Sequence, residues 1–171
     1  MISLAIRPAL DQDAEALASI AALNPTAPQW TAAQFRETLG TPTEGGTLCR
    51  SVLVAEQAGE VAGFAVASAL CNVFPVEAEL ESIAVAPTLQ GCGIGRRLLE
   101  ATLEWATSRH AESLRLEVRA GNDRALRIYE TAGFRQTGTR PGYYAAPLED
   151  AVVMERIIQN PGGDVPVRPL A

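Results

Sequence analysis

The sequence predicts an α/β fold built around one mixed β-sheet, and three observations support this prediction. Two β-rich runs early in the chain flank a short polar turn, which indicates an antiparallel hairpin. A glycine-rich loop and a long amphipathic helix then connect two further strands, which indicates a parallel crossover. The length of 171 residues and the lack of sequence repeats favour a single domain over residues 1–158.

Each element follows from a local pattern. Short β-rich runs bounded by turn residues predict strands. These runs are residues 2–7, 51–55, 61–69, 79–85, 114–118, 134–139 and 151–157. Apolar residues at helical spacing, or a capping signal before helix formers, predict helices. The helices span residues 11–23, 31–39, 96–108 and 122–131.

The helix ends carry clear signals. Asp11 is positioned to cap the first helix, and Asn24-Pro25 ends it. Thr31 and Gln34 form a capping box for the second helix. Gly133 follows the last helix, at the position where glycine commonly ends helices.

The connections between strands are also predicted locally. Residues 57–60 form the hairpin turn, and residues 40–46 form a loop. Pro87 stops the strand at residues 79–85. From Asn160-Pro161 onward the chain is too polar and too broken to pack, so we expect a flexible tail over residues 159–171.

The composition narrows the function classes. The net charge of −6 disfavours binding to a nucleic-acid backbone and suits a small or basic partner. No apolar run approaches the roughly 20 residues that span a bilayer, so no membrane association is expected. Cys49, Cys71 and Cys92 have no metal-ligand spacing and His110 is the single histidine, so no metal is expected. A reducing cytoplasm is the simplest compartment.

A glycine-rich loop gives the strongest chemical signal. Gln90-Gly91-Cys92-Gly93-Ile94-Gly95 joins a strand to a helix. Alternating glycines let the backbone approach a ligand closely and point several N–H groups at one spot. The helix start and Arg96 add positive charge, so the loop suits a pyrophosphate. Such a loop on its own is more often a tight turn, and it matches neither a Walker loop nor a good dinucleotide fingerprint.

The same region resembles a known family. Residues 79–99 resemble the acetyl-CoA motif of the GNAT superfamily, Gln/Arg-x-x-Gly-x-Gly/Ala. Residues 116–134 resemble its second cofactor motif, in the form found in the RimI-type ribosomal-protein alanine N-acetyltransferases. Residues 142–151 carry the paired tyrosines and Glu-Asp-Ala of N-terminal acetyltransferases. The likeness covers about residues 2–157 and implies the GNAT fold, a central mixed β-sheet with splayed parallel strands flanked by helices.

The resemblance implies acetyl-CoA as co-substrate. Its pantetheine arm would pair with the backbone of Ile83, Ala84 and Val85, in a wedge between the strands at 79–85 and 114–118. The Val85 N–H would bind the thioester oxygen. Asn122 would fix the pantetheine or phosphate arm by hydrogen bonds. The residues that hold the pyrophosphate would be Gln90, Gly91, Cys92, Gly93, Ile94, Gly95 and Arg96.

The resemblance also implies an acid and a base. Glu117 is expected to be the general base, acting through water, and Tyr129 the acid that protonates the leaving thiolate. An α-amino group has a pKa near ~8, against ~10.4 for lysine, so a modest base suffices at a chain end. Glu79 is the rival base, at the position that resembles the base of the histone-acetylating branch.

Each of these residues has a structural alternative. Taken singly, Glu117 could be a surface acid that pairs with Arg115 or Arg119. Tyr129 could be a core residue, and Asn122 could be only a helix cap. The order and spacing of all three together favour the functional interpretation.

The acceptor site is expected around four residues. Tyr143 and Tyr144, in the loop between the last two strands, could form a wall over the peptide. Trp30 could line the opposite side, or pack under the first helices; with Pro28 before it and Gln29 between, it resembles the Pro-Trp loop of N-terminal acetyltransferases. Glu79 could add an acidic rim for a basic substrate.

Three functions follow from these expectations. The first is acetylation of a protein N-terminus, with a ribosomal protein as its narrowest form. The second is acetylation of a small amine such as an amino acid, polyamine or antibiotic. The third is a non-catalytic acyl-CoA sensor, which the presence of Glu117 and Tyr129 disfavours.

Overall fold

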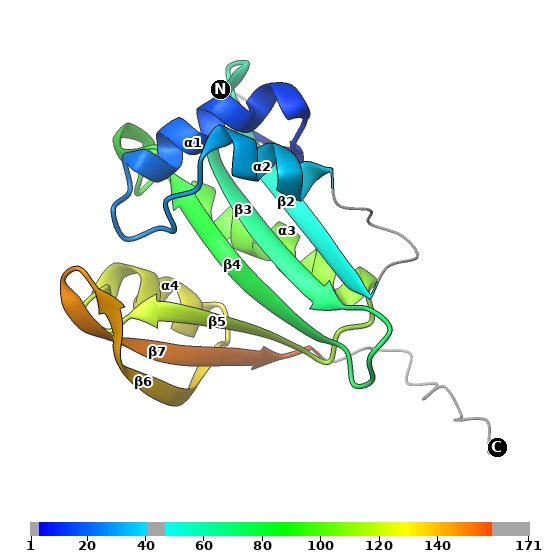
Figure 1. The fold of residues 1–171 in the computed structure, drawn as a ribbon, viewed down its shortest axis with the longest axis vertical. Helices are drawn as coiled ribbons and strands as arrows, with labels where there is room; N and C mark the ends of the chain where they lie inside the picture. The colour runs from blue at the N-terminus through cyan, green and yellow to red at the C-terminus, as the bar shows by residue number, and fades with distance from the viewer. Residues whose placement is uncertain (1–3, 41–46, 159–171) are drawn as a thin grey trace.

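The structure is a seven-stranded mixed sheet with helices on both faces (Figure 1). A computed structural model describes residues 4–40 and 47–158, and the predictions for residues 1–3, 41–46 and 159–171 lie outside that part. The strands are β1 (Leu4–Pro8), β2 (Leu48–Gln57), β3 (Glu60–Leu70), β4 (Glu77–Val85), β5 (Ser113–Arg119), β6 (Arg135–Ala145) and β7 (Leu148–Ile157). The helices are α1 (Ala14–Ala22), α2 (Ala32–Leu39), α3 (Ile94–Ser108) and α4 (Asp123–Thr131), with short 3-10 turns at Asp11–Asp13 and Pro87–Leu89.

The sheet order confirms the predicted fold class. The strands lie in the order β1-β2-β3-β4-β5-β7-β6. β4 and β5 form the parallel pair, joined through α3, and the other neighbouring strands pair antiparallel. This is the early hairpin and central crossover that the sequence predicts.

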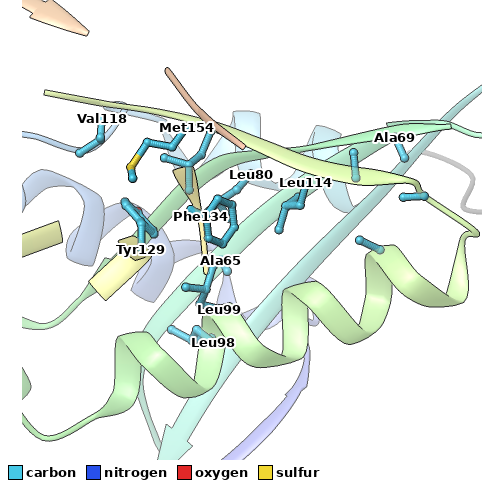
Figure 2. Close-up of a cluster of buried hydrophobic side chains, with 14 of the residues drawn as sticks. Ala65, Ala69, Leu80, Leu98, Leu99, Leu114, Val118, Tyr129, Phe134 and Met154 are labelled. Carbon is cyan, nitrogen blue, oxygen red and sulfur yellow. The ribbon is translucent and has the colours of Figure 1, made fainter. Parts of the chain in front are cut away.

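Two apolar clusters fill the two faces of the sheet. Figure 2 shows the larger cluster, where Leu98 and Leu99 of α3 meet Leu114 of β5, and Phe134 and Met154 pack nearby. The smaller cluster lies under α1 and α2. The sheet is therefore covered by α1 and α2 on one face and by α3 and α4 on the other.

The start of α1 differs from the prediction. Asp11 does not cap the helix, because a 3-10 turn precedes it and α1 begins at Ala14. Asp13 is buried instead, and its carboxylate accepts the Leu10 N–H at 2.7 Å and the Arg7 guanidinium at 2.7 and 3.1 Å. The hydrogen bonds from Arg7 lower the pKa of Asp13 below its ordinary value.

The capping box of α2 is confirmed. The Thr31 N–H donates to the Gln34 Oε1 at 2.8 Å, and the Gln34 N–H donates to the Thr31 hydroxyl at 3.3 Å. Each residue satisfies a backbone donor that the helix itself leaves unpaired.

The last hairpin is longer than predicted. β6 continues to Ala145 and β7 begins at Leu148, so Tyr143 and Tyr144 lie in β6 and not in a loop. Pro141-Gly142 suggests a turn, but the β6–β7 register shifts between Arg140 and Tyr144 and absorbs these residues as a bulge.

Cys49 and Cys71 form a disulfide that the sequence analysis did not predict. Cys49 lies opposite Ala69 in the β2–β3 hairpin, and Cys71 follows two residues later, with the two Cα atoms 6.1 Å apart. Disulfides are uncommon in a reducing cytoplasm, so the compartment stays a prediction. Across residues 4–40 and 47–158, no helix has the length and apolar character needed to cross a membrane.

Gly63 permits the close approach of β3 and β4, and this generates a stability prediction. A Cβ added at Gly63 would lie 2.7 Å from the carbonyl oxygen of Ala84 and 3.2 Å from the Val85 Cα. Because backbone atoms cannot move aside cheaply, we expect Gly63→Ala to lower the free energy of unfolding by about 1–3 kcal/mol. Denaturant unfolding monitored by circular dichroism measures this change.

Gly138→Ala is the matched control for that variant. Gly138 is also a strand glycine, but an added Cβ would meet only Val153 atoms at 3.9 and 4.0 Å, which is an ordinary contact. We expect its stability to change by less than about 0.5 kcal/mol. Equal losses in the two variants would contradict the steric explanation.

Candidate active site

A wedge opens between β4 and β5 because their pairing is short. The two strands pair only from Glu77 with Ser113 to Leu80 with Leu116. In β4 the register against β3 shifts after Leu80, which leaves Glu81 as the extra residue of a bulge. Beyond this point the tips of the two strands lie apart, as Figure 1 shows. We call the space between them the wedge.

A cavity of about 830 Å³ occupies the wedge, within the range of small-ligand sites. It is lined from both faces of the sheet, because Leu116 and Val118 pack with the α3–α4 cluster while Glu117 points to the opposite face. We call the face that carries Glu117 the acceptor side. The lining comes from β4, β5, the glycine loop, the start of α4, the loop after α1 and two tyrosines of β6.

The inner edge of β4 presents peptide groups to the wedge that do not pair with a neighbouring strand. The Ala86 N–H donates to the Ala62 carbonyl of β3 at 2.9 Å. Because peptide groups alternate in direction along a strand, those of Ile83 and Val85 point away from β3, toward the wedge, and those of Ala84 point toward β3. Ile83 and Val85 are thus placed as the sequence analysis expects, whereas the peptide groups of Ala84 serve the sheet.

A side-chain network covers the outer end of that edge. The carbonyl of Val85 accepts the amide groups of Asn24 and Gln90, each at 3.2 Å. The Gln90 amide also donates to the Asn24 Oδ1 at 2.9 Å. Gln90 is therefore a structural link between the glycine loop and the end of β4, and Asn24 is a cavity residue that the sequence analysis missed.

The glycine loop has the backbone conformation that its sequence predicts. Gly91 and Gly93 adopt φ of 86° and 80°, in the left-handed region that favours glycine. Gly93 is the N-cap of α3, which begins at Ile94, two residues before the predicted start. The free N–H groups of the first helical turn and the helix dipole therefore face the loop, which is the geometry of an anion site.

The positive charge at this loop comes from α4 as well as α3. The Arg124 guanidinium donates to the Gln90 Oε1 at 3.0 Å and lies 3.7 Å from the position of a Cβ on Gly91. Arg96 also lines the cavity, and it is exposed and pairs with Glu100 at 2.9 Å. Arg124 was not among the residues predicted to bind the cofactor. Its position in the first turn of α4, the helix that Asn122 caps, could have indicated it.

The two candidate bases lie on the same face and interact. Glu117 follows Leu116, the last residue of β5 that pairs with β4, so it stands at the start of the wedge. Burial, and then the charges of Glu117 and Glu81, raise the pKa of Glu79 above its ordinary value. Glu79 and Glu117 both line the cavity, so either can reach an acceptor there.

Glu117 has different partners from those that the sequence suggested. Its Oε1 lies 2.8 Å from the Arg140 Nε, and it accepts a hydrogen bond from the Tyr143 hydroxyl, which raises the pKa of Tyr143. Arg115 pairs instead with Glu155 at 3.5 Å, and Arg119 pairs with Glu149 at 3.1 Å. The expected pairing of Glu117 with Arg115 or Arg119 is therefore wrong, and its ion-pair partner is Arg140.

Tyr129 and Asn122 each serve the fold and line the cavity. The Tyr129 ring is buried, 5.8 Å from that of Phe134, and burial raises the pKa of its hydroxyl. That hydroxyl therefore stays protonated at neutral pH. The Asn122 Oδ1 accepts the Ala125 N–H at 3.2 Å and so caps α4. The side-chain NH2 group of Asn122 is the part that can donate to a ligand in the cavity.

The acceptor side is walled by the two tyrosines but not by Trp30. The rings of Tyr143 and Tyr144 meet edge to face at 5.1 Å, and both line the cavity. Trp30 packs on Phe35 at 5.4 Å in the α1–α2 cluster and is not part of the cavity lining. Cys92 is exposed and is also outside the lining.

The loop after α1 forms the opposite wall in place of Trp30. Residues 24–28 line the cavity. Gln29, which interrupts the Pro-Trp resemblance, holds this loop: its amide donates to the carbonyls of Ala21, Asn24 and Ala27 at 3.0, 3.1 and 2.8 Å. Within the described part of the chain, no group of three or more His, Cys, Asp or Glu side chains could hold a metal ion.

Comparison with known proteins agrees with this geometry. Residues 14–134 match the model of the Acetyltransferase (GNAT) family. The chain is 37% identical over 132 residues to N-alpha-acetyltransferase RimI of Mycobacterium tuberculosis, which covers 77% of this chain and 78% of that protein. It is 39% identical over 100 residues to the [Ribosomal protein bS18]-alanine N-acetyltransferase of Escherichia coli, covering 57% of this chain and 65% of the relative. The crystal structure of the ribosomal-protein-S18-alanine N-acetyltransferase from Escherichia coli superposes with a TM-score of 0.74 at 30% identity, covering 95% and 99% of the two chains.

The glycine loop generates a binding prediction. Gly93 lines the cavity, and a Cβ added there would enter open space with nothing within 4 Å. Since that space is where a phosphate would meet the loop, we expect Gly93→Ala to weaken coenzyme A binding by about tenfold or more, which corresponds to about 1.4 kcal/mol. Isothermal titration calorimetry measures the dissociation constant.

Gly59→Ala controls for the backbone strain in that variant. Gly59 has φ of 81°, also has nothing within 4 Å of an added Cβ, and lies in the β2–β3 turn. Both variants should lose about 1 kcal/mol of stability, because alanine is disfavoured in this conformation. Gly59→Ala should bind coenzyme A normally, and unchanged affinity in Gly93→Ala would refute the phosphate assignment.

Proposed function

The chain belongs to the GNAT acetyltransferase family and is an N-acetyltransferase, and we propose that it acetylates the α-amino group of a protein N-terminus, with acetyl-CoA as the donor. The observation that carries the acceptor assignment is the pair of edge-to-face tyrosines beside Glu117 on the acceptor side. The similar proteins named above are an N-alpha-acetyltransferase and an enzyme that acts on an alanine of ribosomal protein bS18, which supports this acceptor class. A ribosomal protein is the narrowest form of the proposal.

The donor end of the wedge fits acetyl-CoA. The glycine loop, the start of α3 and Arg124 provide N–H groups and positive charge for a pyrophosphate. The outward peptide groups of Ile83 and the N–H of Val85 offer donors and an acceptor of the kind that the amides of a pantetheine arm require. The Val85 N–H is our proposed donor to the thioester oxygen, where negative charge develops in the transition state.

The acceptor side supplies the acid and the base. A carboxylate takes the proton of the incoming ammonium, and the free amine attacks the thioester carbonyl. The new N–C bond forms, the C–S bond breaks, and the thiolate takes a proton from the Tyr129 hydroxyl. The second proton that the nitrogen loses as the amide forms returns to the Tyr129 oxygen through water, which restores the hydroxyl. We propose Glu117 as the base because it stands at the start of the wedge, just past the last strand pair. Glu79 is the rival, because its raised pKa also suits a base.

Acceptor choice is the direct test of the proposed function. We expect a peptide with a free N-terminus and an internal lysine to be acetylated at the N-terminus, because the α-amine needs less deprotonation and the tyrosines flank the approach. Mass spectrometry locates the acetyl group. The control is the same peptide with an acetylated N-terminus, which should not react. Predominant lysine acetylation, or faster turnover of free amino acids and polyamines, would overturn the proposal.

The acid and base assignments give a second prediction. Glu117→Gln and Tyr129→Phe should each lower kcat by about 10²–10⁴, the usual contribution of general acid–base catalysis. Affinity for acetyl-CoA should stay the same, because both replacements keep the side-chain shape. In Glu117→Gln the rate should follow ionisation of the substrate amine alone, near pH ~8. Steady-state kinetics across pH measures both effects.

Glu79→Gln is the comparison that decides between the two bases. A smaller loss in Glu79→Gln than in Glu117→Gln supports our assignment. If Glu117→Gln retains normal kcat while Glu79→Gln is inactive, Glu79 is the base. If neither variant is impaired, the α-amine needs no protein base, and positioning with the Val85 contact accounts for the rate.

A further inference from the structure

Arg119, at the end of β5, contacts the β6–β7 hairpin in three ways. Its guanidinium donates to the Glu149 carboxylate at 3.1 Å and to the carbonyls of Ala146 and Pro147 at 3.3 and 3.4 Å. The same guanidinium lies over the Tyr144 ring, 4.1 Å from its centroid, as a cation–π contact. The Arg119 side chain is only 12% exposed and its bond to Glu149 is partly buried, whereas its bonds to Ala146 and Pro147 are exposed.

Glu149 extends this set of contacts to the start of α4. Its Oε1 accepts the Gly121 N–H at 2.6 Å, while its Oε2 bonds Arg119. The Gly121 N–H, and then Arg119, lower the pKa of Glu149 below its ordinary value. A Cβ added at Gly121 would lie 2.9 Å from the Glu149 Oε1, so a larger residue at this position would displace the carboxylate. Gly121 directly precedes Asn122, the cap of α4.

The hairpin is held mainly by polar contacts and by strand pairing. Besides Arg119, Glu117 bonds Arg140 and Tyr143, and β7 pairs with β5 as far as Arg119 with Ala151. β6 is an edge strand of the sheet, and nearly all of its residues are exposed. Apolar burial therefore cannot fix where Tyr143 and Tyr144 stand. The Arg119 Nε is buried without a hydrogen-bond partner among the described residues. A buried donor without a partner costs free energy. The contacts of the same guanidinium to the hairpin must therefore offset that cost.

We propose that Arg119 and Glu149 are positioning residues that hold the tyrosine wall of the acceptor side against the start of α4. We call this pair the clip. It joins Tyr144, on the acceptor side, to Gly121, beside the cap that lines the donor end. The clip rests on the proposed function, because it sets the distance between the acceptor peptide and the thioester. Neither residue exchanges a proton in the reaction.

The clip has a kinetic signature that distinguishes it from the acid and base. Arg119→Ala and Glu149→Ala should each lower kcat/KM for the acceptor peptide by about 10- to 100-fold, mainly through KM, since misplacement of a binding wall has effects of this size. The dissociation constant of acetyl-CoA should change by less than about twofold. The apparent pKa of the pH–rate profile should not move. The double variant should be no worse than either single variant, because the two residues act as one unit.

Glu155→Ala is the matched control. Glu155 is also a β7 carboxylate that pairs with a β5 arginine, Arg115, and its side chain is 20% exposed against 23% for Glu149. It is not part of the cavity lining. Its acceptor KM should match that of the wild type within about twofold. Arg119→Lys should restore only part of the activity, because lysine keeps the charge but not the planar group that stacks on Tyr144 and bonds several oxygens.

Hydrogen exchange tests the clip independently of turnover. Amide exchange over residues 140–150 should be faster in Arg119→Ala and Glu149→Ala than in the wild type and Glu155→Ala. Unchanged exchange, an unchanged acceptor KM, or multiplicative losses in the double variant would each overturn the clip. If the wild type acetylates no peptide N-terminus, the proposed function fails, and exchange over residues 140–150 alone then decides whether the clip holds the hairpin.

Discussion

The bulge at Glu81 is the constraint on which the rest of the structure depends. It ends the pairing of β4 with β5 after Leu80 and Leu116, so two neighbouring parallel strands stop sharing hydrogen bonds halfway along. A continuous sheet would bury the inner edge of β4 against β5. The bulge instead leaves the peptide groups of Ile83 and Val85 facing a cavity, so backbone groups take part in lining the donor end. The site therefore lies where β4 and β5 no longer pair with each other.

The two sides of the cavity, on opposite faces of the sheet, carry different chemical groups. On one face, a glycine loop, a helix N-terminus and Arg124 suit an anionic donor. On the other face, Glu79 and Glu117 suit a cationic acceptor. The two substrates can approach from opposite faces and meet in the wedge. Strand alternation provides this separation directly, because neighbouring residues such as Leu116 and Glu117 point to opposite faces.

The acceptor side is held by polar contacts, whereas the donor end is held by the packed core. Tyr129 lies against Phe134 in the α3–α4 cluster, so apolar burial fixes its place. Tyr144 lies on an exposed edge strand, and charged and backbone contacts around Arg119 fix its place. The residues of such a wall can be substituted without disturbing the core. This arrangement suits a family that keeps one donor and varies its acceptors.

The resemblance to the GNAT superfamily pointed to Glu117 and Tyr129, and both line the cavity. The sequence by itself determined the order of the elements, the capping box of α2 and the glycine loop. These features depend on neighbours along the chain, through periodicity, caps and the φ that glycine permits. Tertiary structure alone decided that Glu117 meets Arg140 and Tyr143, that Arg124 reaches the glycine loop, and that Trp30 packs in the core. It also decided that Asp13 is buried and binds Arg7 and the Leu10 N–H, and that Cys49 joins Cys71. These contacts join residues that are far apart in the sequence, and their approach depends on strand register and bulges. A shift of one residue in the register of a strand moves its side chains to the opposite face of the sheet.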